Sequence, residues 1–218
     1  MGGEQFFSNG INLNILEDSK KSGEDGWSNI NAINDLVKSV IFSPNIITVA
    51  SLHQNAGAGG VFLATACDFV VAKDGVVLNP HYKSLGLSGS EYHSYTLPKR
   101  VGESVAKKLL DECLPISAKF AKDIGLVDEL VNSKEQLEGF AKSKIKDDFF
   151  DDFIWEKEEF LEENIEKIEQ HKEQELKIMH PEFWDENSPF HKLRYEFVYK
   201  ICPTTTPKRL KAIDNLVI

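Results

Sequence analysis

The sequence predicts an α/β fold in residues 1–145 and a helical C-terminal region in residues 146–218. Three observations predict this division. In the first part, short apolar runs separated by glycine turns alternate between strand-like and helix-like patterns. Near residue 145 the composition changes, and the remaining chain is rich in charged residues at helical spacing. A length of 218 residues suits one domain with a helical extension.

The alternation of strand and helix is clearest in the middle of the first part. Short β-branched runs bounded by turn residues predict buried strands, and an apolar run after a glycine-rich turn predicts a helix. In order, the predicted elements are a strand at Ile46–Leu52, a turn at His53–Gly60, a helix at Val61–Ala66, a strand at Asp68–Ala72 and, after a hairpin-type turn at Asp74–Gly75, a short strand at Val76–Leu78.

Helical patterns dominate the rest of the chain. Ser117 is a suitable N-cap for one helix, and Gly125 is suited to its C-terminal end. Prolines at positions 203 and 207 end the last helix. The predicted elements are helices at Ser104–Glu112 and Ile116–Gly125, a strand at Leu126–Val131, one or two amphipathic helices at Asp148–Met179, a break at His180–Pro189 and a helix at His191–Ile201.

The composition excludes several classes of protein. The formal net charge is −10, whereas a nucleic-acid-binding surface needs clustered Lys and Arg. No apolar run approaches the roughly 18 residues of a membrane span, and the N-terminus lacks the pattern of a signal peptide. Cys67, Cys113 and Cys202 form no C-x-x-C pair and the six histidines are scattered, so neither a disulfide framework nor a metal site is predicted. A cytoplasmic protein fits these features best.

Two glycine-containing turns are candidates for binding a ligand. The segment Phe7–Leu13 predicts a turn at Asn9–Gly10, which taken alone is a surface turn. The segment Asn55–Gly60 lies between a predicted strand and a predicted helix. Its glycines allow close approach of a ligand, and the free N–H groups at the helix start suit an oxyanion or a phosphate. Close packing of the helix against the strand is the alternative interpretation.

A third segment concentrates groups that are able to transfer protons. It comprises Asn79–Tyr82 and Gly89–His93, which together supply imidazole, phenol and carboxyl groups. General acid–base catalysis uses such groups. A polar loop whose tyrosines pack in the core would give the same pattern.

Together these segments resemble the enoyl-CoA hydratase/isomerase (crotonase) superfamily in order and spacing. The tract Ile116–Leu130 is similar to that family's I-S-A-x-x-A-x-x-x-G-L-V-D-E-[VL] motif, and the resemblance extends from about Gly2 to Val131. It implies an incomplete crotonase-like (ClpP/crotonase) ββα superhelix, followed by the helical extension. In that family two backbone N–H groups bind the thioester carbonyl of an acyl-coenzyme A, and by position these belong to Ile11 and Gly59.

The sequence departs from ordinary hydratases at two positions. The two catalytic glutamates of that family fall where Phe62 and His81 stand here. Phe62 cannot position or activate water, so ordinary enoyl-CoA hydration is not expected. Asn9, Gly10, Asn55 and Gly60 flank the two N–H groups and are the predicted substrate-binding residues.

Where the sequence departs from ordinary hydratases, it resembles the HypX (HoxX) family of nickel-iron hydrogenase maturation factors. Its C-terminal half carries motifs that match five separate segments in the same order, which is a far more specific resemblance than one glycine turn. The matching segments are Phe7–Asn14, Trp27–Val37, Asn55–Val61, Leu78–Lys83 and Gly89–Tyr92.

The HypX resemblance implies synthesis of carbon monoxide. In that family an N-terminal half moves a formyl group from formyl-tetrahydrofolate to coenzyme A, and the crotonase-like half converts formyl-CoA to carbon monoxide and free coenzyme A. We expect Tyr82 and Glu91 to handle the formyl hydrogen or to protonate the departing thiolate, with His81 and Tyr92 as second candidates. Coenzyme A, as a thioester, is the expected carrier. The lysines that could meet its phosphates are taken singly as ordinary surface residues: Lys83, Lys99 and Lys200.

Two alternatives stay open, and both concern the same fold. One is an ordinary enoyl-CoA hydratase or isomerase. The other is an inactive fragment that lacks a complete pocket. By the resemblance, the chain starts after the first strands of a crotonase domain, so we expect an unpaired sheet edge and marginal stability of the isolated chain. A formyl-transferase half on a separate chain is the predicted partner, with formyl-CoA or another acyl-CoA as the ligand.

Overall fold

The strands of this chain form two small sheets. The computed structural model describes residues 2–145 and 147–207. One sheet is parallel and has the order β1-β3-β6, and in the other β2 is parallel to β4 while β5 is antiparallel to it. The strands are β1 (Val49–Leu52), β2 (Ala56–Gly57), β3 (Phe69–Lys73), β4 (Val77–Asn79), β5 (Ile116–Ser117) and β6 (Glu129–Val131).

The chain alternates between the two sheets, and helices follow each pair of strands. Two successive units have this arrangement: β1-β2 followed by α3, and β3-β4 followed by the next helices. Each unit gives one strand to each sheet, which is the ββα repeat expected from the sequence. The predicted hairpin at Asp74–Gly75 is wrong, because β3 pairs with β1 and β6 whereas β4 belongs to the other sheet. Gly75, at φ 85°, turns the chain from one sheet into the other.

Helices cover the sheets, and several of them were not assigned from the sequence. α2 is the longest of these, and it buries Ile30, Val37 and Ile41 along one face. Ser117 caps α6 as expected, since its hydroxyl accepts the N–H of Phe120 at 3.1 Å, and Gly125 follows that helix at φ 83°. The helices before residue 145 are α1 (Leu13–Asp18), α2 (Ser22–Ile41), α3 (Gly59–Thr65), the 3₁₀ turn η1 (Lys83–Leu85), α4 (His93–Val101), α5 (Glu103–Glu112), α6 (Ala118–Asp123) and α7 (Lys134–Ser143).

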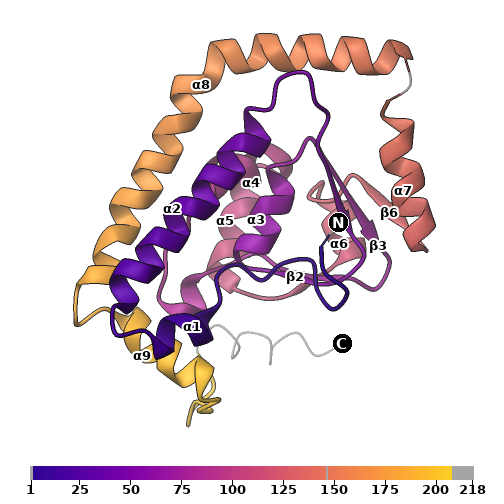
Figure 1. Ribbon diagram of the computed structural model, residues 1–218. Helices are drawn as coiled ribbons and strands as arrows, with labels where there is room; N and C mark the ends of the chain where they lie inside the picture. The colour runs from indigo at the N-terminus through magenta and orange to yellow at the C-terminus, as the bar shows by residue number, and fades with distance from the viewer. Residues whose placement is uncertain (1, 146, 208–218) are drawn as a thin grey trace.

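One long helix, α8 (Asp147–Trp184), wraps around two sides of the molecule (Figure 1). It runs beside α2 and reaches α9 (Pro189–Val198), which lies next to α1. The predicted break at His180–Pro189 begins too early, because the helix continues through Pro181 to Trp184. Met179 and Phe183 on either side of the proline are buried, and their packing outweighs the lost backbone hydrogen bond.

The C-terminal helices share a core with the α/β part. Met179, Phe183 and Phe190 belong to the same buried cluster as Leu52 and Val70 of the parallel sheet. The sequence pattern changes at residue 145, but the hydrophobic core continues across that point, because the helical region contributes to it. Among the described residues, no helix carries an apolar stretch long enough to cross a bilayer.

Candidate active site

Two glycine turns meet at one point of the fold. The N-terminal loop runs alongside β2, where the N–H of Gly57 donates to the carbonyl of Ser8 at 3.0 Å. Gly10, at φ 77°, approaches so closely that a Cβ built on it would lie 3.4 Å from the backbone nitrogen of Gly59. The N–H groups of Ile11 and Gly59 donate to no other group within residues 2–145 and 147–207. Two unused backbone donors thus lie on adjacent turns, as an oxyanion hole requires.

The second turn is held in a strained conformation. Ala58 has φ 45° and ψ −125°, a region that residues other than glycine rarely adopt, and its N–H donates to the carbonyl of Asn79 at 2.9 Å. Such strain costs on the order of 1–3 kcal/mol and tends to occur at functional sites. Gly60 packs directly on the backbone of Ser8, which leaves no room for a side chain. α3 therefore starts with Gly59 facing Gly10.

A cleft of about 1180 Å³ opens beside these turns. Asn9, Gly10 and Ile11 line it from the N-terminal loop, and Ala58 lines it next to Gly59. The facing wall comes from the C-terminal segment and is largely apolar, with Phe197, Ile201, Pro203 and Pro207. The cleft can hold an extended ligand whose carbonyl reaches the two N–H groups.

Glu91 places a buried carboxylate at the same point. Its side chain is 1% exposed, and a Cβ built on Gly59 would lie 2.5 Å from its Oε1. The other oxygen, Oε2, accepts hydrogen bonds from the hydroxyls of Ser90, at 2.6 Å, and Tyr82. Burial raises the pKa of Glu91, and the two hydroxyl donors oppose that shift only in part. One oxygen is thus anchored, while the other faces the Gly59 turn.

Tyr82 and Phe62 fill the space beneath the turns. Their rings stack with centroids 5.0 Å apart, and Phe62 is fully buried. Burial and the neighbouring Glu91 carboxylate raise the pKa of Tyr82 well above its ordinary value, so its phenol stays protonated and acts as a donor.

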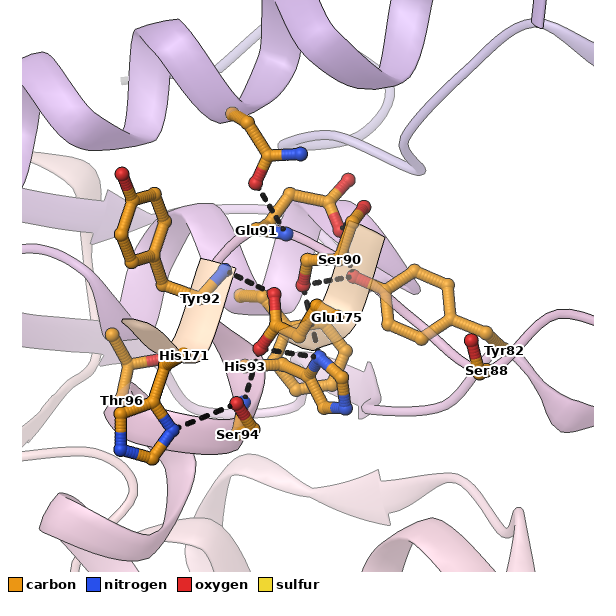
Figure 2. A network of polar contacts seen from close by, with 12 residues as sticks. Tyr82, Ser88, Ser90, Glu91, Tyr92, His93, Ser94, Thr96, His171 and Glu175 are labelled. Atoms are coloured by element: carbon orange, nitrogen blue, oxygen red, sulfur yellow. Dashed lines mark hydrogen bonds and ion pairs between the residues drawn. The ribbon is translucent and has the colours of Figure 1, made fainter. Parts of the chain in front are cut away.

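Glu91 sits on an unusual turn (Figure 2). Glu91 and Tyr92 are consecutive residues with φ 62° and 56°, although neither is glycine. The N–H of Glu91 donates to the side-chain oxygen of Asn34 on α2 at 3.1 Å, and the N–H of Tyr92 donates to Glu175 on α8 at 3.0 Å. Figure 2 shows Glu175 between Tyr92 and His93, in the middle of the network.

The predicted site residues are brought together only in part. Ile11, Gly59, Asn9, Gly10, Tyr82 and Glu91 gather at the cleft or directly beneath it, and His81 lines it. The Tyr92 ring points away from the Glu91 side chain (Figure 2). Its hydroxyl donates to Glu169 of α8 at 2.6 Å. Its phenol is therefore not directed at the hole.

Two of the predicted substrate-binding residues have structural contacts instead. Asn55 binds neighbouring backbone, since its carbonyl accepts the N–H of Phe7 and its side chain accepts the N–H of Val77. Gly60 is buried against Ser8. Neither lines the cleft, because both are used to hold the two turns together.

Of the three lysines, Lys200 has its ammonium 4.4 Å from the ring of Phe197, which lines the cleft wall. Lys83 stands between His81 and Ser84, which also line the cleft, and its ammonium pairs with Asp111. Lys99 packs over Phe160 at a separate cavity. Among the described residues, no three His, Cys, Asp or Glu side chains gather as metal ligands would.

Three further polar residues belong to the site: Asn79 and His93 lie in segments that the sequence singled out without giving them a role, and Glu175 lies outside those segments. The side-chain oxygen of Asn79 is buried, has no hydrogen-bond partner in the described part of the chain, and belongs to a residue that lines the cleft. His93 and Glu175 form a buried pair at 3.1 Å. A sequence signal existed for Glu175, since it lies seven residues after Ile168 and four before Met179, on the apolar side of its helix.

These features define a domain of the crotonase type, with two backbone donors facing an acyl-binding cleft. The chain belongs to the enoyl-CoA hydratase/isomerase family, whose model matches residues 1–177. Known enoyl-CoA hydratases share the fold: that of Bacillus halodurans superimposes with a TM-score of 0.77 at 22% identity, over 88% of this chain and 78% of the hydratase.

More similar proteins are hydrogenase maturation factors. The chain is 33% identical to the hydrogenase maturation factor HoxX of Bradyrhizobium diazoefficiens over 94% of its own length and 38% of that protein. The crystal structure of HypX from Aquifex aeolicus in complex with tetrahydrofolic acid matches with a TM-score of 0.90 at 42% identity, over 96% of this chain and 38% of HypX. The chain thus corresponds to a crotonase-fold part of these longer proteins.

Proposed function

We propose that this chain is the acyl-CoA-handling module of a HypX-type hydrogenase maturation protein and that it converts formyl-CoA to carbon monoxide and free coenzyme A. The single observation that carries the proposal is the placement of a buried carboxylate, Glu91, against Gly59 beside two unused backbone donors. An ordinary hydratase needs carboxylates at the positions of Phe62 and His81. Here one of those positions is filled by a buried aromatic ring, and the acid–base group comes from another turn.

The reaction needs only a proton to move from carbon to sulfur. The N–H groups of Ile11 and Gly59 bind the formyl oxygen and draw electron density from the formyl carbon. The Glu91 carboxylate takes the formyl hydrogen as a proton. The electron pair of the broken C–H bond stays on carbon, the C–S bond breaks with its pair going to sulfur, and carbon monoxide leaves. The thiolate then takes the proton back from Glu91, and no oxidant or reductant is consumed.

The surroundings of Glu91 suit this task. Burial raises its pKa, and a carboxylate with a raised pKa is a stronger base once it is ionised. Tyr82 and Ser90 hold Oε2 through their hydroxyls and leave Oε1 toward the Gly59 turn. The packing of Phe62 on Tyr82 favours the smallest acyl group.

The cleft supports a coenzyme A thioester as the ligand. Its volume of about 1180 Å³ and its apolar wall from Phe197 to Pro203 suit the pantetheine arm, and the Lys200 ammonium over the Phe197 ring could meet a phosphate there. We propose that a formyl-transferase part, on this or another chain, supplies formyl-CoA. HypX of Aquifex aeolicus, whose structure contains tetrahydrofolic acid, is consistent with such a supply.

The test supplies formyl-CoA directly to the purified chain, so that no formyl-transferase is needed. Carbon monoxide is trapped by reduced myoglobin and read from its absorption spectrum. We expect release by the parent and a large loss in Tyr82→Phe and Glu91→Gln. Tyr95→Phe is the matched control, because the buried Tyr95 hydroxyl has no hydrogen-bond partner in the described structure. Equal release by the parent and both site variants would refute the assignment, and hydration of crotonyl-CoA would favour the hydratase alternative.

A further inference from the structure

The turn that carries Glu91 lacks the usual means of support. Left-handed backbone at two consecutive non-glycine residues persists only when the surroundings impose it. The helix that follows, α4, begins after Tyr92, and the side chain of Tyr92 gives it no cap. Both of these deficits are met by side chains from elsewhere in the chain.

Glu175 of α8 supplies most of that support. Its Oε2 accepts the N–H of Tyr92 at 3.0 Å, and its Oε1 accepts the N–H of Ser94 at 2.7 Å. The same oxygen lies 3.1 Å from Nδ1 of His93. The Glu175 side chain is 4% exposed, and a buried carboxyl group needs donors such as these for both of its oxygens. The carboxylate therefore caps α4 from a distant helix.

Asn34 of α2 supplies the rest. Its side-chain oxygen accepts the N–H of Glu91 at 3.1 Å, and its amide group donates to the carbonyl of Ile30 at 3.0 Å. Asn34 is 1% exposed, and the second hydrogen bond fixes the direction of the first. α2 and α8 pack against each other, so the two supports act from one rigid pair of helices.

We propose that Glu175 and Asn34 are positioning residues for the Glu91 carboxylate. By fixing two adjacent N–H groups in left-handed backbone, they hold Oε1 of Glu91 against the Gly59 turn. This inference rests on the proposed function for its catalytic consequence, whereas its structural part can be tested independently. It makes α8 a part of the active site, although neither Glu175 nor Asn34 lines the cleft.

The chain offers a matched control on the same helix. Glu169 of α8 also contacts this turn, but it accepts a hydrogen bond from the hydroxyl of Tyr92 and none from the backbone of residues 90–94. Glu175→Gln and Glu169→Gln each remove one carboxylate charge from α8. Only the first removes an acceptor from the backbone that carries Glu91.

The first measurement is amide hydrogen exchange of residues 90–94 in the 218-residue chain, followed by NMR or mass spectrometry. We expect faster exchange in Glu175→Gln and in Asn34→Leu, and parental exchange in Glu169→Gln. The second measurement is turnover of formyl-CoA. Both variants should lose kcat on the order of 10- to 100-fold, as expected for a misplaced catalytic group, while KM stays near the parental value.

A double-mutant comparison separates positioning from general destabilisation. If Glu175 acts through Glu91, adding Glu175→Gln to Glu91→Gln should cause no further loss of kcat. An additive loss would overturn the proposal, as would parental exchange or parental kcat in a folded Glu175→Gln. If Glu175→Gln does not fold, Asn34→Leu decides by the same criteria.

Failure of the proposed function gives a different result. A parent chain that releases no carbon monoxide, together with faster exchange in Glu175→Gln but not in Glu169→Gln, would refute the proposed reaction and retain the positioning of the Glu91 turn. If the parent is active and Glu175→Gln has the same amide exchange and the same kcat, the proposed reaction stands and the positioning role of Glu175 is refuted.

Discussion

Gly59 is the position where one added methyl group should affect the proposed chemistry most directly. A Cβ built there would lie 2.5 Å from Glu91 Oε1, whereas ordinary contact begins at 3.4 Å. In Gly59→Ala the carboxylate must therefore retreat by about 0.9 Å, or the start of α3 must move by a similar distance. Both groups are buried, and Tyr82 and Ser90 hold the far oxygen, so neither can move freely.

The expected effects on activity and stability can be estimated separately. A displacement of about 1 Å costs on the order of 100-fold in turnover, which corresponds to about 2.7 kcal/mol in the activation barrier. Crowding of a packed core costs about 1–3 kcal/mol in unfolding free energy. For a chain of this length that lowers Tm by roughly 2–12 °C. The variant should thus stay folded at room temperature while it loses most of its carbon monoxide release.

The control is another glycine in a helix. A Cβ on Gly139 of α7 meets nothing within 4 Å, so Gly139→Ala should keep full activity and gain roughly 0.5–1 kcal/mol of stability. The assays are thermal melting followed by circular dichroism, and carbon monoxide release from formyl-CoA. Release by folded Gly59→Ala at the parental rate would refute the reasoning, because the carboxylate could then leave its observed place without consequence.

Three further expectations follow from burial. Phe62→Ala should lower the unfolding free energy by about 3–5 kcal/mol in a urea titration, because a fully buried ring is removed, and should let acetyl-CoA bind more tightly than in the parent by calorimetry. Burial raises the pKa of Glu91, so between the unfolded pKa and the raised folded pKa the folded chain keeps a proton that the unfolded chain has lost, and stability falls as pH rises through this range. Glu91→Gln should therefore be more stable than the parent at pH 8 and lose that advantage at pH 4, and a stability difference that stays constant with pH in urea titrations would contradict this. Iodoacetamide at pH 8 should label the exposed Cys202 and spare Cys67, because burial raises the pKa of the Cys67 thiol to about 11. Early labelling of Cys67 in the native protein, detected by mass spectrometry, would contradict this.

The parts of the site that were predicted from sequence are those encoded locally. Each oxyanion-hole turn is a run of a few residues whose glycines mark positive φ or close approach, as at Gly10 and Gly60, so the pattern itself carries the information. The error at Asp74–Gly75 has the same origin. Turn residues specify that the chain changes direction, but they do not specify which sheet receives the next strand.

The remaining parts depend on contacts between distant residues. Glu175 is one of many acidic residues in α8, and its helical spacing separates it from exposed neighbours such as Glu173 but does not show what it contacts. The same holds for Asn34, which lies four residues after the buried Ile30 and three before the buried Val37. Periodicity could place both on buried faces, but not identify the N–H groups that they accept.

The shared core leads to one last prediction, for a chain that ends at residue 145. Such a chain loses Met179, Phe183 and Phe190, which are at most 2% exposed and pack in the same cluster as the parallel sheet. Burial of each is worth about 1.5–3 kcal/mol, so the three together contribute on the order of the whole stability of a typical domain. It also loses Glu175, the cap of α4. We therefore expect residues 1–145 to lack cooperative thermal unfolding by circular dichroism, whereas residues 1–207 should retain it. A sharp melting transition in the shorter chain would show that the α/β part folds without α8, and the Glu91 turn would then have to be held by α2 alone.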